Sequence, residues 1–354
     1  MKTKLLTLFL SILSSTALAY EFTVGGLYYN IITDVAPYTV ELTYLPSPGG
    51  SRLDNYSHHY TKNVVIPQEV TYNKVTYKVV SIGELAFVHY KALDSIVIPD
   101  GIVKIGDGAF KYCDSLKSVS IPNTVKSIGS DAFSGCTSLT KTNFRGSISD
   151  WCRIKIGTWG NPLEYSNDFY IYNKKVEDLI IPSNVDSIYD YAFNGCSVRT
   201  VNISKSVKHI GVNAFHDCEN LQFITSHALI PPAIDELSLN SNPLCYIPCG
   251  TFDAYFASDW KKYCYQFIEQ SSVYDITLLT NNTYGIAKVA SRPDCNSAIL
   301  TAIPNEGCTF VKWSDGNTQS TRYIEVTEDI TLTAEFVKKG YAIHVYQDCN
   351  TTIE

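Results

Sequence analysis

Histidine and cysteine are the residues of this sequence best suited to metal binding or catalysis, and their spacing favours neither. The chain has 354 residues with seven histidines, and none of them falls in an H-E-x-x-H or similar metal-binding pattern. The adjacent pair His58-His59 could hold a stray metal ion, although a solvated surface pair is the commoner arrangement. G-x-S-x-G, Walker and G-x-G-x-x-G motifs are absent. We therefore predict no catalytic residue, no cofactor and no metal site, and a protein that is not an enzyme.

Four of the eleven cysteines recur at one position of a repeated segment. Such recurrence indicates packing, because a free cysteine behaves as a small buried hydrophobe with a weak donor. Cys152, next to Trp151, lacks an identifiable base and orienting group, so we expect both side chains to pack the chain's core. The four recurring residues are Cys113, Cys136, Cys196 and Cys218.

The remaining cysteines leave several pairings open. Cys245, Cys249 and Cys264 lie close together, and a disulfide with Cys264 as one partner is one interpretation. A zinc site is disfavoured because no fourth ligand has suitable spacing. Cys295 and Cys308 flank an expected hairpin and form a second candidate pair. The sequence does not decide the connectivity among these five cysteines.

The segment that carries the four recurring cysteines predicts the fold. It follows the pattern I-x-I-P-x-x-V-x-x-I-G-x-x-A-F-x-x-C-x-x-L, with small lapses. Its Ala-Phe pairs recur at intervals of 23, 23, 60 and 22 residues. The long interval holds one further repeat, lengthened by an insertion over residues 145–175. The phenylalanines of these pairs are Phe87, Phe110, Phe133, Phe193 and Phe215.

A repeat of 20–29 residues with this apolar spacing is typical of a leucine-rich repeat. We predict a β-rich leucine-rich-repeat solenoid over residues 61–270, with short strands and a one-turn helix in each coil, followed by a small β-domain. Proline ends each I-x-I-P strand because it has no N–H for the ladder. Gly106, Gly129 and Gly211 should relax the backbone at a corner. Stacked coils should align the phenylalanines and cysteines into two ladders, with the cysteines about 5 Å apart.

The repeat pattern resembles the BspA-like leucine-rich-repeat family of bacterial surface proteins. The segment 150–154, followed by Asn161-Pro162-Leu163, resembles a lengthened coil of that family, and residues 20–44 resemble its entry segment. This resemblance implies an exported, non-catalytic surface protein. Some members are similar to adhesins that bind host matrix proteins or other cells, so the implied partner is an extracellular protein or glycan, a host matrix protein among them.

Both ends of the solenoid depart from the repeat. Residues 1–19 read as a signal peptide, with Lys2 and Lys4 before an apolar run and Ala17-Leu18-Ala19 as the cleavage site. The signal would direct export to the cell surface or secretion, and the mature chain would lack these residues. Residues 20–60 should form an N-terminal β cap and residues 230–270 a C-terminal cap. In that second cap we expect a short helix over 253–263 with Phe252, Phe256 and Trp260 facing inward.

Residues 273–337 have the alternating pattern of a small β-domain, with Asp315-Gly316 as a hairpin signal. The segments 307–313 and 330–336 resemble the β-repeat of internalin-type surface proteins, where it usually acts as a spacer. Residues 338–354 are either a tail or the start of a truncated further domain. No other stretch is long and apolar enough to span a membrane.

The charge balance argues against nucleic acid as a partner. The chain has 28 basic and 35 acidic residues, a net charge of −7, and no basic cluster longer than two residues. We instead expect a protein or glycan partner, because the predicted binding face described below has mostly small and polar side chains. The chain's oligomeric state stays open.

The outward residues of the I-x-I-P strands form the predicted binding face, about five coils tall. An inert solvated face, in a purely structural component, is the main alternative, and a glycan-processing site in the insertion is a further one. The first row is Val97, Ser120, Asn143, Ile180 and Asn202. The neighbouring row is Ser95, Ser118, Lys141, Asp178 and Thr200.

The insertion offers a second candidate surface, because exposed aromatic residues are favoured binding anchors. The same rings could instead form the core of the lengthened coil. They are Trp159, Tyr165, Phe169, Tyr170 and Tyr172.

Overall fold

The computed structural model describes residues 20–44, 64–236, 238–270, 274–280, 283–291 and 297–339. The expected signal peptide, the pair His58-His59, Cys295 and the expected tail therefore lie outside the described residues, apart from residues 338 and 339. The described residues divide into two compact units, residues 1–246 with 254–267 and residues 247–253 with 268–354. The first unit is the predicted solenoid and the second is the predicted small β-domain, so the fold class is confirmed.

The solenoid begins with antiparallel strands and then becomes parallel. Strands β1 to β3 form a meander, and β3 pairs in parallel with β5, which leads the first column of coils. Strands β4 and β5 form a hairpin whose turn residues Asn73 and Lys74 both have positive φ. The bounds are β1 (Phe22–Val24), β2 (Leu27–Thr33), β3 (Thr39–Thr43), β4 (Glu69–Tyr72) and β5 (Val75–Ile82).

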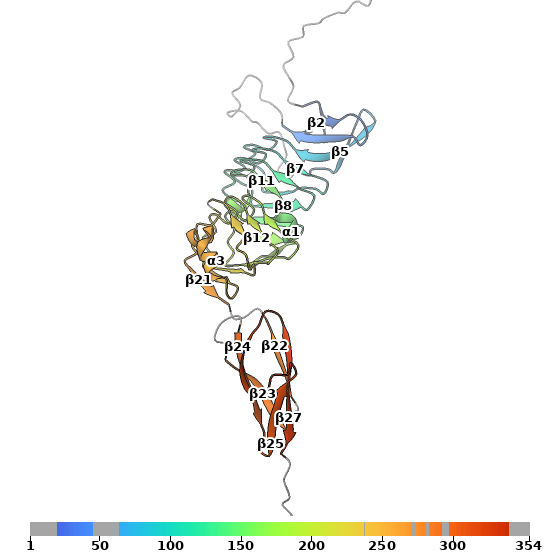
Figure 1. Cartoon of the computed structure of the whole chain (residues 1–354). Coiled ribbons are helices and arrows are strands. Elements are labelled where there is room, and N and C mark those ends of the chain that lie inside the picture. The colour runs from blue at the N-terminus through green and yellow to red at the C-terminus, as the bar shows by residue number, and fades with distance from the viewer. Residues whose placement is uncertain are drawn as a thin grey trace, which may run out of the picture. The chain divides into compact units, whose positions relative to one another are not determined.

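Each coil then contributes two strands, which pair in parallel with the strands of the next coil. Figure 1 shows these strands side by side along the solenoid, from β5 through β7 and β8 to β12. The I-x-I-P column holds β6 (Ser95–Val97), β8 (Ser118–Pro122) and β10 (Lys141–Arg145). The second column holds β7 (Lys104–Ile105), β9 (Ser127–Ile128) and β11 (Lys155–Ile156).

The insertion interrupts both columns. A capping box starts helix α1, because Ser147 Oγ accepts from the Asp150 N–H and the Asp150 carboxylate accepts from the Ser147 N–H. Strand β12 pairs in parallel with β10 and then folds back onto β13. The elements of the insertion are α1 (Ile148–Trp151), α2 (Leu163–Ser166), β12 (Phe169–Ile171) and β13 (Lys174–Lys175).

After the insertion, two new parallel sheets begin. One has the order β14-β16-β18-β20-β21 and the other β15-β17-β19. The first is built from β14 (Asp178–Ile181), β16 (Thr200–Ile203), β18 (Phe223–Ser226), β20 (Leu244–Ile247) and β21 (Gln266–Glu269). The second is built from β15 (Ser187–Ile188), β17 (His209–Ile210) and β19 (Ala233–Ile234).

The one-turn helix expected at A-F-x-x-C is wrong, because this side of the coil is a chain of tight turns. The Phe87 N–H donates to the Ala109 carbonyl of the next coil over 2.7 Å, and Phe193 repeats this with Ala214 over 2.8 Å. In a helix, these N–H groups would instead donate to carbonyl groups of the same coil. Left-handed residues precede each Ala and follow each Phe by two, which breaks the helical path. They are Leu85, His89, Gly108, Tyr112, Asp131, Gly135, Tyr191, Gly195, Asn213 and Asp217.

Glycine is required at the I-G corner for a different structural reason from the one predicted. Gly106, Gly129 and Gly211 do not have positive φ. Instead, a Cβ on Gly129 would lie 2.5 Å from the backbone nitrogen of Asp107 in the preceding coil. A Cβ on Gly106 would lie 2.6 Å from the Glu84 nitrogen. Close approach of successive coils, rather than conformational freedom, requires glycine here.

The repeat phenylalanines stack in the core. The Phe87 and Phe110 ring centroids are 5.2 Å apart, the Phe110 and Phe133 centroids 5.1 Å, and the Phe193 and Phe215 centroids 5.4 Å. At the insertion the stack changes character, because Phe144, Trp151 and Phe169 form tilted and edge-to-face contacts instead. The Trp151 indole N–H donates to the Ala192 carbonyl over 2.6 Å, so the insertion is tied to the following coil.

The C-terminal cap closes the solenoid with two short helices, α3 (Phe252–Ala257) and the 3₁₀ helix η1 (Asp259–Lys262). Trp260 is buried as predicted, but Phe252 and Phe256 are 42% and 46% exposed. Their predicted inward orientation is wrong, because Tyr255 supplies the buried ring of α3. Cys245 and Cys264 form a disulfide, which confirms Cys264 as a partner.

The second unit is a small β-sandwich with sheets β22-β27-β25 and β23-β24-β26 around Trp313. Strands β25 and β26 lie in different sheets, so Asp315-Gly316 joins two sheets and the predicted hairpin is wrong. Cys308 is a free buried thiol, so the candidate pair with Cys295 is also wrong. The strands are β22 (Ile276–Thr280), β23 (Gly285–Ser291), β24 (Ser297–Pro304), β25 (Cys308–Trp313), β26 (Thr321–Glu325) and β27 (Ile330–Lys338).

Candidate functional site

The two predicted rows have the expected alignment within each half of the solenoid. Val97 lies opposite Ser120, which lies opposite Asn143. In the second half, Asp178 lies opposite Thr200 and Ile180 opposite Asn202. The two halves belong to different sheets, with the β12–β13 hairpin between them in sequence. The expectation of one continuous sheet face five coils tall is therefore wrong.

Asn143 is not part of the exposed surface, because the hairpin turn engages its side chain. Its amide oxygen accepts the Asn173 N–H over 2.6 Å, and its Nδ2 donates to Ser120 Oγ over 3.2 Å. Tyr172 and Asn173 both have positive φ, as a two-residue hairpin turn requires. Asn143 is 4% exposed and stabilises this turn, so its side chain is not accessible to a ligand.

The side chain of Lys141 also contacts the hairpin. Its ammonium lies 4.8 Å from the centroid of the Tyr170 ring and donates to Asn173 Oδ1 over 3.0 Å. Such a cation–π contact contributes about 0.5–1 kcal/mol at a partly exposed site. The upper face, defined as the outward residues of β6, β8 and β10, therefore ends in a cluster of Lys141, Tyr170 and Asn173, next to the small residues Ser118 and Ser120.

The lower face, on β14 to β20, is larger and more aromatic than the sequence indicated. Phe223 lies opposite Thr200, and Thr225 lies opposite Asn202. The next strand continues the rows with Leu244 and Tyr246. These four residues were missed because their coils lack the I-x-I-P signature. The alternation of Phe223-Ile224-Thr225-Ser226 was the available signal.

A cation accompanies the aromatic part of the lower face. The Arg199 guanidinium lies 5.6 Å from the centroid of the Phe223 ring, and its Nε donates to Gln222 Oε1 over 3.0 Å. The Phe223 and Tyr246 ring centroids are 6.3 Å apart. Ile180, at the other end of the same face, is 62% exposed. Aromatic residues and arginine are enriched at protein interfaces.

The structure divides the aromatic residues of the insertion between core and surface. Phe169 is buried, Tyr165 and Tyr170 are partly buried, and Trp159 and Tyr172 are 58% and 65% exposed. Neither single expectation covers all five rings. Trp159 and Tyr172 are therefore the only members of this set that present most of their surface to solvent.

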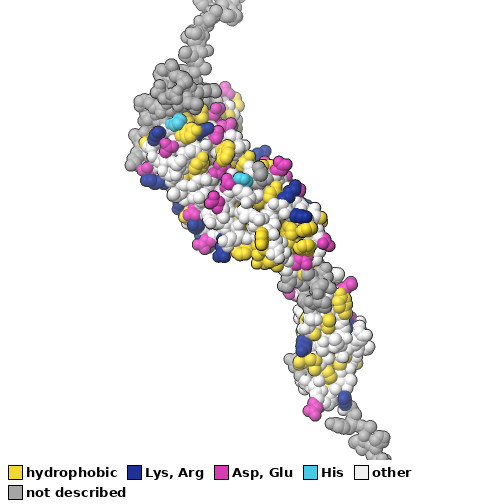
Figure 2. Space-filling view, turned by 90° about the vertical axis from the view of Figure 1, so that its left-hand side faces the viewer, with side chains coloured by type: hydrophobic (Ala, Val, Ile, Leu, Met, Phe, Trp, Pro, Cys, Tyr) yellow, Lys and Arg dark blue, Asp and Glu magenta, His cyan; other side chains and the backbone are white. Residues whose placement is uncertain are grey.

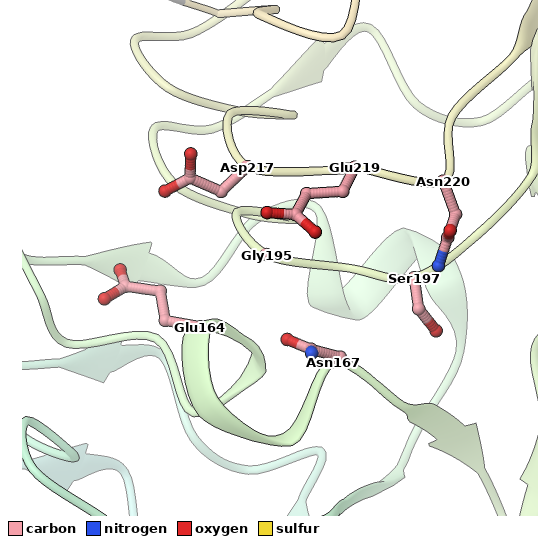
Figure 3. A pocket seen from close by; sticks show the side chains of 7 residues that line it. All are labelled: Glu164, Asn167, Gly195, Ser197, Asp217, Glu219 and Asn220. Carbon is pink, nitrogen blue, oxygen red and sulfur yellow. The ribbon is translucent and has the colours of Figure 1, made fainter. Parts of the chain in front are cut away.

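A polar pocket of about 280 Å³ lies beside the insertion (Figure 3). Its acidic members are Glu164 on α2 and Asp217 and Glu219 on a later turn. Asn194 Nδ2 donates to Glu164 Oε1 over 2.9 Å, while Glu164 Oε2 has no hydrogen-bond partner among the described residues. Burial raises the pKa of Glu164 to about 7, with the charges of Asp217 and Asp131 acting in the same direction.

This pocket brings Glu164 of the insertion close to two carboxylates of a later coil. In Figure 3 the carboxylates of Glu164 and Asp217 extend to one side, while Asn167 and Glu219 occupy the middle of the view. No cation lines the pocket. Cys152, the other reactive type in the insertion, is fully buried, and burial raises its pKa to about 12. A thiol in this state is a poor nucleophile.

Neither a metal-binding cluster nor a membrane-spanning helix occurs among the described residues. Within the described ranges, no three His, Cys, Asp or Glu side chains are placed to hold a metal ion. Acidic and basic side chains are interspersed along the solenoid on the face drawn in Figure 2. In the part of the chain that the structure describes, no helix is long and apolar enough to cross a membrane.

Parallel coils of 22 or 23 residues, each built from a strand, a corner and a turn ladder, define a leucine-rich-repeat solenoid. The model of the BspA-type leucine-rich repeat region matches six copies over residues 57–153 and 164–241. The repeats of the solenoid thus match the model of that family, and the predicted resemblance is confirmed. The model of the divergent InlB B-repeat domain matches residues 274–340.

Solved structures of bacterial leucine-rich-repeat proteins are similar to this chain. A leucine-rich cell surface protein of Faecalibacterium prausnitzii A2-165 is 26% identical over 60% of this chain and 56% of its own, with a TM-score of 0.37. The T. pallidum leucine-rich repeat protein is 20% identical over 58% and 81%, also with a TM-score of 0.37. This chain thus spans little more than half of the first of these proteins. No curated protein matches the chain.

Proposed function

We propose that this chain is an exported recognition protein that binds an extracellular protein or glycan through the outer face of its solenoid. The lower face, defined as Asp178, Ile180, Arg199, Thr200, Asn202, Phe223, Thr225, Leu244 and Tyr246, is the main contact surface in this proposal. The match of its repeats to the BspA-type leucine-rich repeat region supports the general role. The signal-like residues 1–19 support export.

The observation that carries the proposal is the composition of the lower face. Exposed Ile180, the Phe223–Tyr246 pair and Arg199 stand among short polar side chains of the same sheet. A face of this kind supplies apolar anchors with hydrogen-bonding groups around them, which suits a broad contact. The upper face contributes less, because Asn143 and Lys141 are engaged by the hairpin.

The test is a binding experiment with two charge-matched double variants. The secreted chain from Tyr20 onward is applied to arrays of matrix proteins and glycans. Ile180→Glu with Asn202→Glu places two carboxylates on neighbouring outward positions of the lower face. We expect any bound array member to be lost, since an unpaired charge buried in an interface costs several kcal/mol.

The matched control carries Thr137→Glu with Ser183→Glu, two exposed positions outside that face. It adds the same charge and should bind as the wild type does. Equal binding by all three proteins would exclude the lower face as the contact surface. Binding to no array member by folded wild-type protein would favour a purely structural role.

A glycan-processing activity is the second candidate. The observation in its favour is the raised pKa of Glu164 beside Asp217 and Glu219, since glycosidases use a carboxylic acid with a raised pKa and a second carboxylate. Hydrolysis of a glycan panel that disappears in Glu164→Gln would establish this activity. A panel left intact by wild type removes it without affecting the recognition proposal.

A further inference from the structure

A second cavity lies at a corner of the solenoid, apart from the lower face and the acidic pocket. It has a volume of about 480 Å³ and lies between the turn after β16 and the loop after β18. Val207, Ala228, Leu229, Ile230 and Pro231 provide its apolar lining. The volume is within the range of small-molecule sites, and the lining is mostly apolar as such sites are.

All the charged or titratable groups that line this cavity are cationic or can become so. They are Lys205, Lys208 and His227, and no carboxylate lines it. Among the described residues, none of these three side chains forms an ion pair with a carboxylate. Unpaired cations around an apolar cavity are unusual in a chain whose net charge is −7. They give the cavity a preference for anions, opposite to that expected of the acidic pocket beside the insertion.

The cavity wall is a feature of one coil. In the preceding coil, His209 follows Ile203 by six positions, whereas their paired residues Ala233 and Ser226 are seven positions apart. The added residue belongs to the segment Ala228-Leu229-Ile230-Pro231-Pro232, which projects Ile230 so that it is 83% exposed. Leu229, which also lines the cavity, is 57% exposed, so this loop presents two adjacent aliphatic side chains to solvent.

The C-terminal cap holds this wall in place. The Trp260 indole N–H donates to the Pro232 carbonyl over 2.8 Å. The Tyr255 hydroxyl donates to the Ala228 carbonyl over 2.9 Å and contacts Ser226 Oγ over 2.6 Å. Both rings are fully buried. The loop is thus fixed at both ends by buried hydrogen bonds, so a ligand would find the cavity already formed and the ordering cost of binding would be small.

We propose that this corner cavity binds an apolar group that carries a carboxylate, such as an aliphatic acid or an apolar residue at the C-terminus of a peptide. The apolar part lies against Val207, Ala228 and Ile230. The carboxylate lies at the rim between Lys205, Lys208 and His227, where charge-assisted hydrogen bonds replace its hydration. This site is separate from the lower face, so its failure leaves the recognition proposal intact.

The equivalent corner of another coil provides a matched control. Lys126 aligns with Lys208 in the repeat, and its ammonium donates to the Asn123 carbonyl over 3.0 Å. Lys155 is a second exposed lysine on the same column of strands. Lys126→Glu with Lys155→Glu therefore changes the net charge by the same amount as Lys205→Glu with Lys208→Glu. All four side chains are on the surface, so folding should survive in both variants.

The probes are decanoate, decanol and decylammonium, which share one aliphatic chain and differ in charge. Calorimetric titration of the full secreted chain should show saturable decanoate binding, at least about tenfold tighter than decanol and with no binding of decylammonium. Lys205→Glu with Lys208→Glu should weaken decanoate by about tenfold or more, and the Lys126/Lys155 control should bind as wild type. A leucine-ended peptide, free or amidated at its C-terminus, then shows whether peptide carboxylates also fit.

Three results would overturn the proposal. Equal affinity for decanoate and decanol would mean that the cations play no part in recognition. Equal weakening in both double variants would mean that net charge, not this cavity, attracts the acid. Absence of decanoate binding in folded wild-type protein would overturn it as well. Broadening of the His227 imidazole signal in an NMR titration locates the bound acid independently of the affinity measurement.

Discussion

The thiol of Cys136 donates a hydrogen bond to the carbonyl oxygen of Phe110 in the preceding coil, with an Sγ–O distance of 3.1 Å. The cysteine ladder therefore connects successive coils as well as filling space between them. The Phe110 carbonyl also accepts the Cys113 N–H over 3.2 Å, so the thiol is a second, weak donor to a carbonyl that already has a backbone partner. The same bond recurs from Cys113 to Phe87 and from Cys218 to Phe193.

The repeat thiols should be inert in the folded protein. Burial raises the pKa of Cys196 to about 12 and raises the pKa of Cys218 well above its ordinary value. Because the thiolate is the reactive form, a thiol reagent at pH 8 should label neither residue until denaturant is added. Peptide mapping after labelling gives the answer for each cysteine. Rapid labelling of Cys196 under native conditions would mean that the ladder opens or is reactive.

Gly129→Ala should destabilise the solenoid by about 1–3 kcal/mol. The new Cβ would lie 2.5 Å from the Asp107 backbone nitrogen, and a backbone atom cannot rotate away as a flexible side chain can. Urea unfolding measures the loss. Thr137→Ala, an exposed position of the same coil, should change the free energy of unfolding by less than about 0.5 kcal/mol. Equal stabilities would show that the coils can separate at this corner without cost.

Glu164→Gln should stabilise the protein above neutral pH and not below pH 4.5. The pKa of Glu164 is raised from 4.5 to about 7, so the folded protein binds this proton more tightly than the unfolded chain does. The free energy of unfolding therefore falls as the pH rises through that interval, and glutamine removes this loss. With solvent screening, we expect about 1 kcal/mol at pH 8, or a rise of about 2–4 °C in Tm.

Melting curves of both proteins at several pH values test this sign. The variant and the wild type should converge at pH 4 and diverge at pH 8. A glutamine variant that is less stable at pH 8 would mean that the ionised carboxylate has a stabilising partner.

Removal of the Cys245–Cys264 disulfide should loosen the C-terminal cap. The bond closes a loop with a sequence separation of 19, for which chain entropy gives about 3 kcal/mol. Replacing both cysteines by serine should expose Trp260, which is fully buried in the cap, and shift its fluorescence to the red. Intact protein in reducing agent should change in the same direction. Unchanged fluorescence in both experiments would assign the cap's stability to packing around Tyr255.

The sequence predicted the solenoid because each coil repeats its apolar positions at nearly constant intervals. Phe110, Phe133 and their equivalents recur with an alanine before them, so the core could be assigned position by position. The sequence could not predict the chain of tight turns at A-F-x-x-C. Its left-handed positions hold Leu85 and Tyr191 as well as Gly135 and Gly195. Hydrogen bonds between coils, not residue preference, impose that conformation.

The candidate surface was harder to predict than the core. Alternation identified which strand residues point outward, and this is correct for Ile180 and Val97, which are both 62% exposed. It failed at Asn143, because a hairpin thirty residues later covers that side chain. A contact of this range leaves no local signal. Phe223 and Tyr246 were missed for the opposite reason, since the strand pairing persists after the repeat signature has faded.

Alternate residues of each strand are under different structural constraints, because one set packs in the core and the other faces outward. Val201 and Ile203 are held by the core, whereas Thr200 and Asn202, one residue away, contribute little to it. Mutation can therefore rewrite the outer positions of coil after coil while the inner ones stay fixed. Under the proposed recognition role, a lineage that carries this scaffold could change its partner at small cost to folding, and could lengthen the contact surface by duplicating whole coils.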